Sequence, residues 1–350
     1  MKEFDSQMRH SGYQIWLLTL SLAAATFAAI VYATGMGHIA VPAEEILRVI
    51  AARITGNSAL LAGIDPVFPF VVFDVRLPRI LTATLVGGGL AMSGVIYQGI
   101  LLNPLADPYT LGVSSGAAFG AALALLANLS MMGHFSVPLF AFVGAALTLL
   151  VVLYLSSFNG QISANTLILS GVIVGAILAA GISFLKYLAD EQVAVIIFWL
   201  MGSFASRTWL DVGVVAGAVL CGLVLSLYYA RDLNILSLGN RSADTLGVES
   251  TRVRWLLLLG ASLVTAVCVS VSGIIGFIGL IVPHLMRFLV GPDNRKLLPV
   301  SILAGALLLL VADTVTRAVL PVEVPIGVLT ALIGGPFFCV IFRRRQRRAV

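Results

Sequence analysis

The sequence predicts an all-α, polytopic membrane protein with about ten transmembrane helices and both termini on the cytoplasmic side. Hydrophobic residues make up 59% of the 350 residues and charged residues only 11%, whereas soluble domains carry about 25% charged residues. Apolar runs long enough to cross a hydrocarbon core of about 30 Å recur along the whole chain. We therefore expect one integral-membrane domain over residues 1–350, with its core at about 13–343, rather than two soluble domains.

The first crossing is expected at about residues 13–35, where a long apolar run follows Lys2 and Arg9. A cleaved signal peptide is the alternative, since it also starts with basic residues, but this apolar run is longer than a usual signal core. Residues 37–74 mix prolines with acidic and basic side chains, a pattern that predicts an extramembrane loop with a short amphipathic helix.

The remaining crossings are separated mostly by short turns marked by glycine or proline. They are predicted at about 78–101, 109–128, 135–156, 163–187, 209–230, 255–272, 274–290, 297–319 and 326–343. Residues 190–203 predict a short helix or half-crossing, because the apolar run there is too broken to span. Small residues at helical spacing, such as Gly112, Gly116 and Gly120, favour a compact helix bundle.

The basic residues indicate the orientation. With both termini in the cytoplasm, fourteen of the 21 Lys and Arg residues fall on that side and seven on the other, which is the bias of the positive-inside rule. The tail contributes most strongly, with Arg343, Arg344, Arg345, Arg347 and Arg348. Binding of nucleic acid by this tail is the alternative, but five arginines directly after an apolar helix are explained more simply as a topology anchor.

Patterns of catalytic and metal-binding residues are missing from the sequence. The four histidines are scattered along the chain as His10, His38, His134 and His284. No HExxH motif occurs, and no Gly-x-Ser-x-Gly elbow follows a strand-like segment. The three cysteines, Cys221, Cys268 and Cys339, lie inside apolar runs without metal-ligand spacing. We therefore expect that the chain is not an enzyme and binds no metal ion or cofactor itself.

The acidic residues weigh against ion-coupled transport. Of sixteen Asp and Glu residues, only Asp313 falls well within a predicted crossing, whereas ion-coupled carriers keep ionisable groups inside the membrane. Asp313 precedes Arg317 by four residues, so we expect the two side chains to pair on one helical turn. An ion-coupled secondary carrier is the alternative from another functional class, and an intramembrane enzyme is a more distant one.

Coupling to ATP would require a separate ATPase subunit. None of the three lysines, Lys2, Lys186 and Lys296, lies in a Gly-x-x-x-x-Gly-Lys-Ser/Thr phosphate loop. Residues 232–250 form the longest polar interval predicted on the cytoplasmic side. Gly239 and Gly247 are expected to break helices there, and residues 242–244 to cap a short one. The interval is either the docking surface of an ATPase or a plain connecting loop.

Six stretches of the sequence occur together and in a fixed order. They are Val75–Arg79, Gly99–Gly116, Phe198–Ser203, Leu233–Val248, Gly273–Arg287 and Val324–Phe338. In content and order they resemble the FecCD-type permeases, the transmembrane subunits of binding-protein-dependent ABC importers for iron–siderophore complexes, haem and cobalamin. NPLADP and GFIGLIVPH, from the second and fifth stretches, are specific to that family in combination.

The resemblance implies a set of partners and a cargo class. It implies a dimer with a second copy or a homologous permease, two ATP-binding subunits that hold ATP and Mg, and a periplasmic or lipid-anchored substrate-binding protein. The location is the cytoplasmic membrane of a bacterium or archaeon, with no nucleic acid partner. The expected cargo is an iron(III)–siderophore chelate, with cobalamin or haem as alternatives.

The resemblance also implies roles for particular residues. Arg76, Arg79 and Arg317 match arginines that contact glutamates of the binding protein in the cobalamin permease, so they are expected to dock it through charge complementarity. Interfacial snorkelling is the alternative for each arginine. The residues 232–250 align with the family's coupling helices, and the expected contacts with the ATPase are Leu236, Leu238, Gly239, Ala243, Leu246 and Gly247.

A cytoplasmic gate is the last expectation from the resemblance. Asn103 and Leu105 match one pair of gate positions of the cobalamin permease, and Ala164 and Asn165 align with the second pair. The cobalamin permease carries hydroxyl residues at the second pair, which Ala164 lacks. This departure weakens the gate assignment and disfavours cobalamin as cargo.

Overall fold

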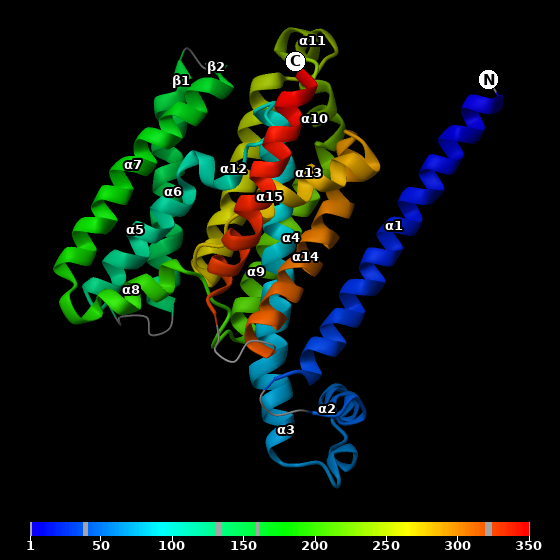
Figure 1. Ribbon diagram of the computed structural model, residues 1–350, viewed down its shortest axis with the longest axis vertical. Coiled ribbons are helices and arrows are strands. Elements are labelled where there is room, and N and C mark those ends of the chain that lie inside the picture. The colour runs from blue at the N-terminus through cyan, green and yellow to red at the C-terminus, as the bar shows by residue number, and fades with distance from the viewer. Residues whose placement is uncertain (1, 38–40, 130–134, 159–160, 319–323, 350) are drawn as a thin grey trace.

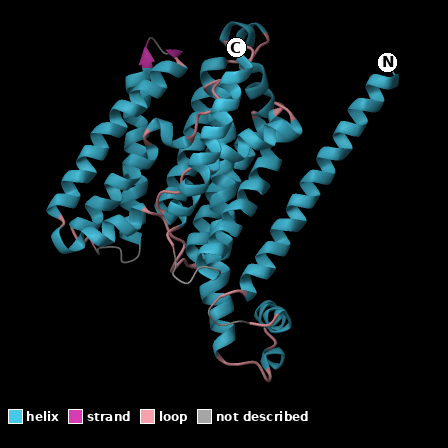
Figure 2. Ribbon diagram, viewed as in Figure 1, coloured by secondary structure: helices cyan, strands magenta, loops and turns pink. Residues whose placement is uncertain are grey.

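Long helices that run between two ends dominate the computed structural model, which describes residues 2–37, 41–129, 135–158, 161–318 and 324–349 (Figures 1 and 2). The helices of the bundle are α1 Lys2–Gly35, α4 Leu77–Ile100, α5 Val113–Leu126, α6 Ser136–Ser156, α7 Ala164–Leu188, α9 Trp209–Tyr228, α12 Ser250–Ser272, α13 Ile278–Val290, α14 Asn294–Ala318 and α15 Ile326–Ala349.

Short elements connect them. The short helices are α2 Ala43–Thr55, α3 Val67–Phe70, α8 Val193–Leu200, α10 Ala230–Leu236 and α11 Asn240–Thr245, with 3₁₀ turns η1 Ser58–Leu61, η3 Pro108–Leu111 and η5 Asp190–Gln192 and a π-helical segment η2 Val71–Arg76. Strands β1 Ser157–Phe158 and β2 Gln161–Ile162 form an antiparallel hairpin of two residues each.

The predicted all-α, polytopic class is confirmed. Among the described residues, seven helices are long and apolar enough to cross a membrane, and three shorter apolar helices lie at Val113–Leu126, Ile278–Val290 and Ile326–Cys339. The two termini lie at the same end of the bundle (Figure 1), as an even number of crossings requires. The assignment of that end to the cytoplasm stays a prediction.

Helix α4 forms the centre of the bundle. Of its most apolar stretch, 83% is buried inside the protein, and it packs against α9, α12, α13 and α14. Glycine permits the closest approaches: a Cβ atom on Gly87 would overlap the carbonyl oxygen of Gly305 on α14. Because small residues let helix backbones touch, α4 and α14 pack as one tight pair.

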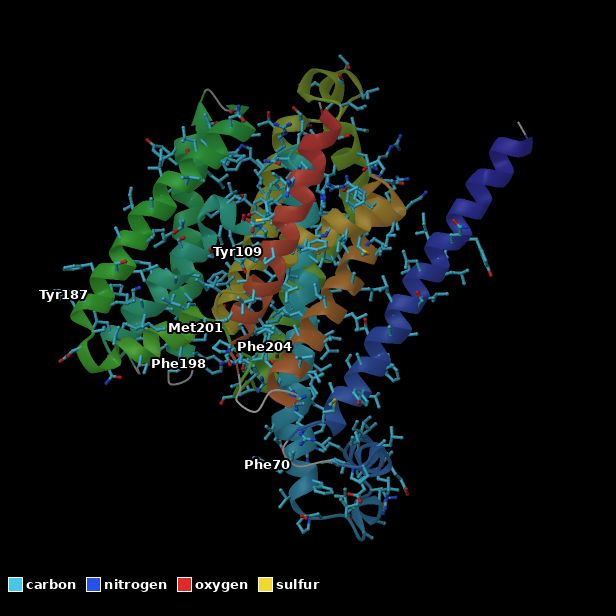
Figure 3. All side chains as sticks on the ribbon, viewed as in Figure 1. Phe70, Tyr109, Tyr187, Phe198, Met201 and Phe204 are labelled. Carbon is cyan, nitrogen blue, oxygen red and sulfur yellow. The ribbon has the colours of Figure 1, made fainter. Side chains whose placement is uncertain are left out.

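Helices α5, α6 and α7 form a second layer beside this pair, with α8 across its lower edge (Figure 1). A Cβ on Gly116 or Gly120 of α5 would overlap the carbonyl oxygens of α6, at Gly144 and Phe140 respectively. The close helix packing predicted from the glycine spacing is thus confirmed for α5. Tyr187 at the end of α7 points away from the bundle (Figure 3).

The crossing predicted at 78–101 begins earlier than expected. Elements α3, η2 and α4 form one helical span over Val67–Ile100, so part of the predicted loop is helical. The π-helical turn ends at Arg76, two residues before Pro78, whose ring and missing N–H would otherwise interrupt a regular helix. The short amphipathic helix predicted in the loop is confirmed as α2.

The segment predicted as a short helix or half-crossing does not span. Helix α8 has eight residues, which at 1.5 Å per residue is about 12 Å. Figure 3 shows Phe198, Met201 and Phe204 along the chain that leads from α8 toward the central helices. Phe204 is fully buried there.

Candidate functional site

Arg79 on α4 and Asp313 on α14 form a buried ion pair. Nη2 of Arg79 lies 2.8 Å from Oδ1 of Asp313, and Nε donates to both carboxylate oxygens at 3.1 and 3.2 Å. The side chains keep 11% and 1% of their exposure. The predicted pairing of Asp313 with Arg317 is wrong. The planar guanidinium of Arg79 reaches both carboxylate oxygens from the neighbouring helix, a geometry that the sequence spacing within α14 does not reveal.

Arg76 and Arg317 both bind the C-terminal turn of α1. Nη1 of Arg76 donates to the carbonyl oxygen of Thr34 at 2.8 Å, and Nη2 of Arg317 donates to that of Ala33 at 2.9 Å. Further bonds from the two arginines reach the carbonyls of residues 35–36. The last carbonyls of a helix lack intrahelical partners and carry the negative end of its dipole. The two arginines therefore cap α1 and attach it to α4 and α14.

The three arginines predicted to dock a binding protein are thus brought together at one end of the bundle. Arg76 and Arg79 are only 5% and 9% exposed, and Arg317 is partly buried. Direct contact with a binding protein stays a prediction, and in this structure their described bonds are to the chain itself. The capping role escaped sequence reasoning because the end of α1 lies more than 40 residues from Arg76.

The exposed surface at this end is formed by the α2–α3 region, residues 43–76. It has its own small core of residues from α2 and the π-helical turn, including Ile46, Val49 and Val72. Ile54 and Phe70 remain 79% and 61% exposed. Figure 1 shows this region projecting beyond the helix bundle.

A cavity of about 270 Å³ borders the Arg79–Asp313 pair. Its wall includes Gly202, Phe204 and Pro325, from the connections that follow α8 and precede α15. The irregular backbone here is hydrogen-bonded across segments; for example, the Gly327 N–H donates to the Met201 carbonyl at 3.0 Å. Such pairing is what allows non-helical backbone to lie inside a membrane protein.

The NPLADP turn follows the opposite end of α4. Oδ1 of Asn103 accepts the Leu105 N–H at 3.0 Å, and Oδ1 of Asp107 accepts the N–H groups of Tyr109 and Thr110 at 3.1 and 2.9 Å. Burial raises the pKa of Asp107 to about 6, although these two backbone bonds oppose the shift. The polar residues of the motif therefore fix the shape of the turn.

Tyr109, labelled in Figure 3, ties this turn to another part of the bundle. Its hydroxyl donates to the Ile275 carbonyl at 2.6 Å, between α12 and α13. The NPLADP and GFIGLIVPH stretches, distant in sequence, are therefore neighbours in the fold.

The predicted gate residues lie at the ends of helices. Asn103 and Leu105 are partly buried in the turn after α4. Ala164 and Asn165 begin α7 after Ser163, whose Oγ accepts the Thr166 N–H at 3.2 Å. Ala164 packs against the core and Asn165 is exposed. That these residues close a pathway stays a prediction.

Helices α10 and α11 stand at the end that also holds the termini (Figure 1). Gly239 and Gly247 flank α11 with φ of 96° and 82°, values that favour glycine, so the predicted helix breaks are confirmed. The cap predicted at residues 242–244 is wrong, because α11 already begins at Asn240. Asp244 instead accepts the N–H of Ser250 at 3.2 Å, at the start of α12.

The predicted coupling residues divide by exposure. Leu236 and Ala243 are fully buried, whereas Leu238 and Leu246 are 63% and 60% exposed. The buried pair anchors α10 and α11 on the bundle. The exposed pair places apolar side chains on a polar segment outside the spanning helices.

A polar cluster ties α10 to the N-terminus of α14. Nδ2 of Asn234 donates to Oδ1 of Asp293 at 2.7 Å, and Oδ1 of Asn234 accepts both the N–H and Nδ2 of Asn294 at 2.8 Å. Sequence reasoning missed this cluster because its two halves are about sixty residues apart. Each half alone has the composition of an ordinary solvated turn.

Comparisons with known proteins extend these observations. The FecCD transport family matches residues 24–344. The cobalamin import system permease protein BtuC of Halobacterium salinarum is 44% identical, over 86% of this chain and 80% of its own. The molybdate import system permease protein MolB of Haemophilus influenzae is 42% identical, over 91% and 92%. A solved inward-facing conformation of a metal-chelate type ABC transporter aligns with a TM-score of 0.81 at 38% identity, covering 93% and 98% of the two chains.

Proposed function

The chain belongs to the FecCD transport family, and from this premise we propose that it is the transmembrane permease subunit of a binding-protein-dependent ABC importer. It works as a dimer in the cytoplasmic membrane of a bacterium or archaeon. Two partner subunits bind ATP and Mg and hydrolyse the nucleotide, and this chain holds no cofactor of its own.

The exposed leucines of the coupling segment are the observation that carries this proposal. Leu238 and Leu246 are more than half exposed, in the turns that follow α10 and α11, two short helices that buried neighbours hold in place. An apolar pair on a small polar surface fits a protein partner, since interface anchors are apolar side chains ringed by polar groups. An ATPase subunit that docks here can push on the bundle.

The two ends of the bundle then act in sequence. The loaded binding protein docks over the α2–α3 region and the arginine cluster of Arg76, Arg79 and Arg317. Closure of the ATPase subunits moves α10 and α11 at the opposite end. The pathway between the two copies opens alternately, with Asn103 and Leu105 in one gate pair and residues 164–165 in the other.

We propose an iron(III)–siderophore-type chelate as cargo, with cobalamin or haem as alternatives. The structural neighbour is a metal-chelate type transporter, which supports the chelate class. The cobalamin and molybdate permeases are almost equally similar to this chain, so overall identity does not select among cargoes. Selection rests largely with the binding protein.

An ion-coupled carrier is the alternative mechanism. It requires an acid that can take up and release an ion, and Asp313 is the acid that the sequence places well inside a crossing. Its carboxylate is held by Arg79 at 2.8 Å, a geometry that favours a structural charge. The ion pair therefore supports the ATP-coupled mechanism.

Native mass spectrometry of the complex tests the proposal. The chain, purified with its partner ATPase and binding protein, is expected to give two permease copies, two ATPase subunits and one binding protein. A chain that binds no ATPase subunit would contradict the proposal. Titration of the binding protein with an iron(III) siderophore, haem, cobalamin and molybdate then identifies the cargo.

A further inference from the structure

The cluster of Asn234, Asp293 and Asn294 joins a coupling helix to a helix that crosses the whole bundle. Asn234 uses both functional groups of its side chain: the amide donates to Asp293, and the oxygen accepts two hydrogen bonds from Asn294. Asn294 is 5% exposed. Asn234 itself is half-buried. A side chain held by three hydrogen bonds has little freedom, so we expect α10 and the start of α14 to move together.

Packing reinforces the same junction. Leu233, one residue before Asn234, is 1% exposed and lies against Gly99 at the end of α4, where a Cβ on the glycine would come within 2.9 Å of its side chain. Helix α10 thus contacts both members of the α4–α14 pair at their coupling ends. Movement of α10 relative to either helix would break packed or hydrogen-bonded contacts.

Helix α14 carries this connection to the other end of the bundle. Its 25 residues span about 37 Å at 1.5 Å per residue. Near its far end, Asp313 binds Arg79 of α4, and Arg317 binds the Ala33 carbonyl of α1. Between the two ends, Gly87 and Gly305 keep α4 and α14 in backbone contact. Contacts at both ends and in the middle therefore hold α4 and α14 together, and we expect the pair to move as a rigid body.

We propose that Asn234 is a positioning residue that transmits movement from the coupling helices to the α4–α14 pair, and through it to the Arg79–Asp313 and Arg317–α1 contacts. The inference rests on the proposed function and names the route by which ATP hydrolysis at one end changes the binding-protein end. Asn234 is suited to this because its amide and oxygen satisfy a carboxylate and an amide at once.

The test uses the full complex in liposomes, measuring uptake per ATP hydrolysed and the stimulation of ATPase activity by the loaded binding protein. Asn234→Asp places a second carboxylate against Asp293. We expect about a tenfold loss in uptake per ATP, the equivalent of a charge-assisted hydrogen bond. Basal ATPase activity should persist, because the ATPase contacts at Leu238 and Leu246 are untouched.

The swap of Asn234→Asp with Asp293→Asn provides the rescue. The carboxylate and amide exchange places, so the amide at 293 can donate to the carboxylate at 234, which still accepts from Asn294. Uptake per ATP should return to within about twofold of wild type, a result that a general loss of stability would not give. Ser183→Ala, which removes a side-chain hydrogen bond to the Ala179 carbonyl on α7, outside both proposed docking surfaces and the α4–α14 pair, serves as the control and should couple normally.

Each outcome decides the inference. Normal coupling in Asn234→Asp and in Asn234→Ala would overturn it, and so would a swap that stays uncoupled while the complex assembles. If the complex with Asn234→Asp fails to assemble, Asn234→Ala is used instead, because alanine adds no repulsion against Asp293. Loss of coupling in Asn234→Ala would then support the inference, and normal coupling would overturn it. Failure of the wild-type complex to transport on ATP would instead contradict the proposed function, so the two failures are distinguishable.

Discussion

The predicted contact residues at the two ends of the bundle differ in exposure. At the α10–α11 end, Leu238 and Leu246 are 63% and 60% exposed and available to a partner. At the α2–α3 end, Arg76 and Arg79 are 5% and 9% exposed and bind carbonyls or a carboxylate of the chain itself. One end offers side chains outward, and the other uses them to hold three helices together.

Residues that match the same family motifs can therefore have two different roles: contact with a partner, or stabilisation of the chain itself. A residue that only contacts a partner can be lost without harm to the subunit, whereas a buried arginine with bonds to its own chain cannot. The arginine end is therefore expected to lose stability first when mutated, and the coupling end to lose its partner first.

The largest expected effect is at the Arg79–Asp313 pair. Arg79→Ala leaves the Asp313 charge buried without a partner, which costs about 3–5 kcal/mol of folding stability. The variant in which both residues become leucine should recover most of that loss, because no buried charge remains. Thermal unfolding of the purified chain in detergent measures both. Equal stability of Arg79→Ala and wild type would contradict the buried pair.

The coupling leucines should show a large effect of another kind. Leu238→Asp with Leu246→Asp removes two apolar anchors and is expected to weaken ATPase binding by about 2 kcal/mol or more, roughly thirtyfold. Thermal stability should stay within about 0.5 kcal/mol, because exposed substitutions rarely affect folding. Titration of the permease with the ATPase subunit measures the affinity. An unchanged affinity would remove these leucines from the interface.

The capping arginines sharpen the comparison further. Arg317→Gln removes charged donors from the end of α1 and should cost about 1.5 kcal/mol of stability. If Arg317 also docks the binding protein, the same variant should weaken docking and reduce its dependence on salt. Affinity measured at two salt concentrations distinguishes these roles. A loss of stability without any change in docking would leave Arg317 with the capping role alone.

An effect confined to the pH dependence is expected at Asp107. Its pKa is raised from 3.8 to about 6 in the fold by burial, so the native turn holds the proton more tightly than the unfolded chain does. Stability from this group is therefore full below pH 3.8 and decreases as the pH rises through about 6. Asp107→Asn should flatten that dependence in unfolding curves measured from pH 4 to 7. A variant with the wild-type pH dependence would contradict the assignment.

Much of the fold could be predicted from the sequence because membrane crossing leaves a strong local signal. Each of the ten predicted apolar runs contains a helix in the described residues, seven of them long enough to span a membrane, and closely spaced glycines such as Gly116 and Gly120 allow close packing. The start of the helix at Val67 could not be predicted, because Pro69 and Pro78 suggest that the helix is interrupted. A π-helical turn before Pro78 accommodates the second proline.

The site was predictable only where it depends on local features. The turns at Gly239 and Gly247 follow from residue type alone. The partner of Asp313 does not, because Arg79 is 234 residues away, and the nearest basic residue in its own helix was the wrong choice. The Asn234–Asp293 contact was missed for the same reason, because it pairs ordinary polar residues that are far apart in the sequence.

The most direct test of the central claim is uptake by the purified chain in liposomes, with and without the partner ATPase subunits. The loaded binding protein is present outside, and either ATP is supplied to the ATPase subunits or a proton or sodium gradient is imposed. We expect cargo to enter only when the ATPase subunits and ATP are both present. Uptake that is driven by an ion gradient in the absence of the ATPase subunits would contradict the account.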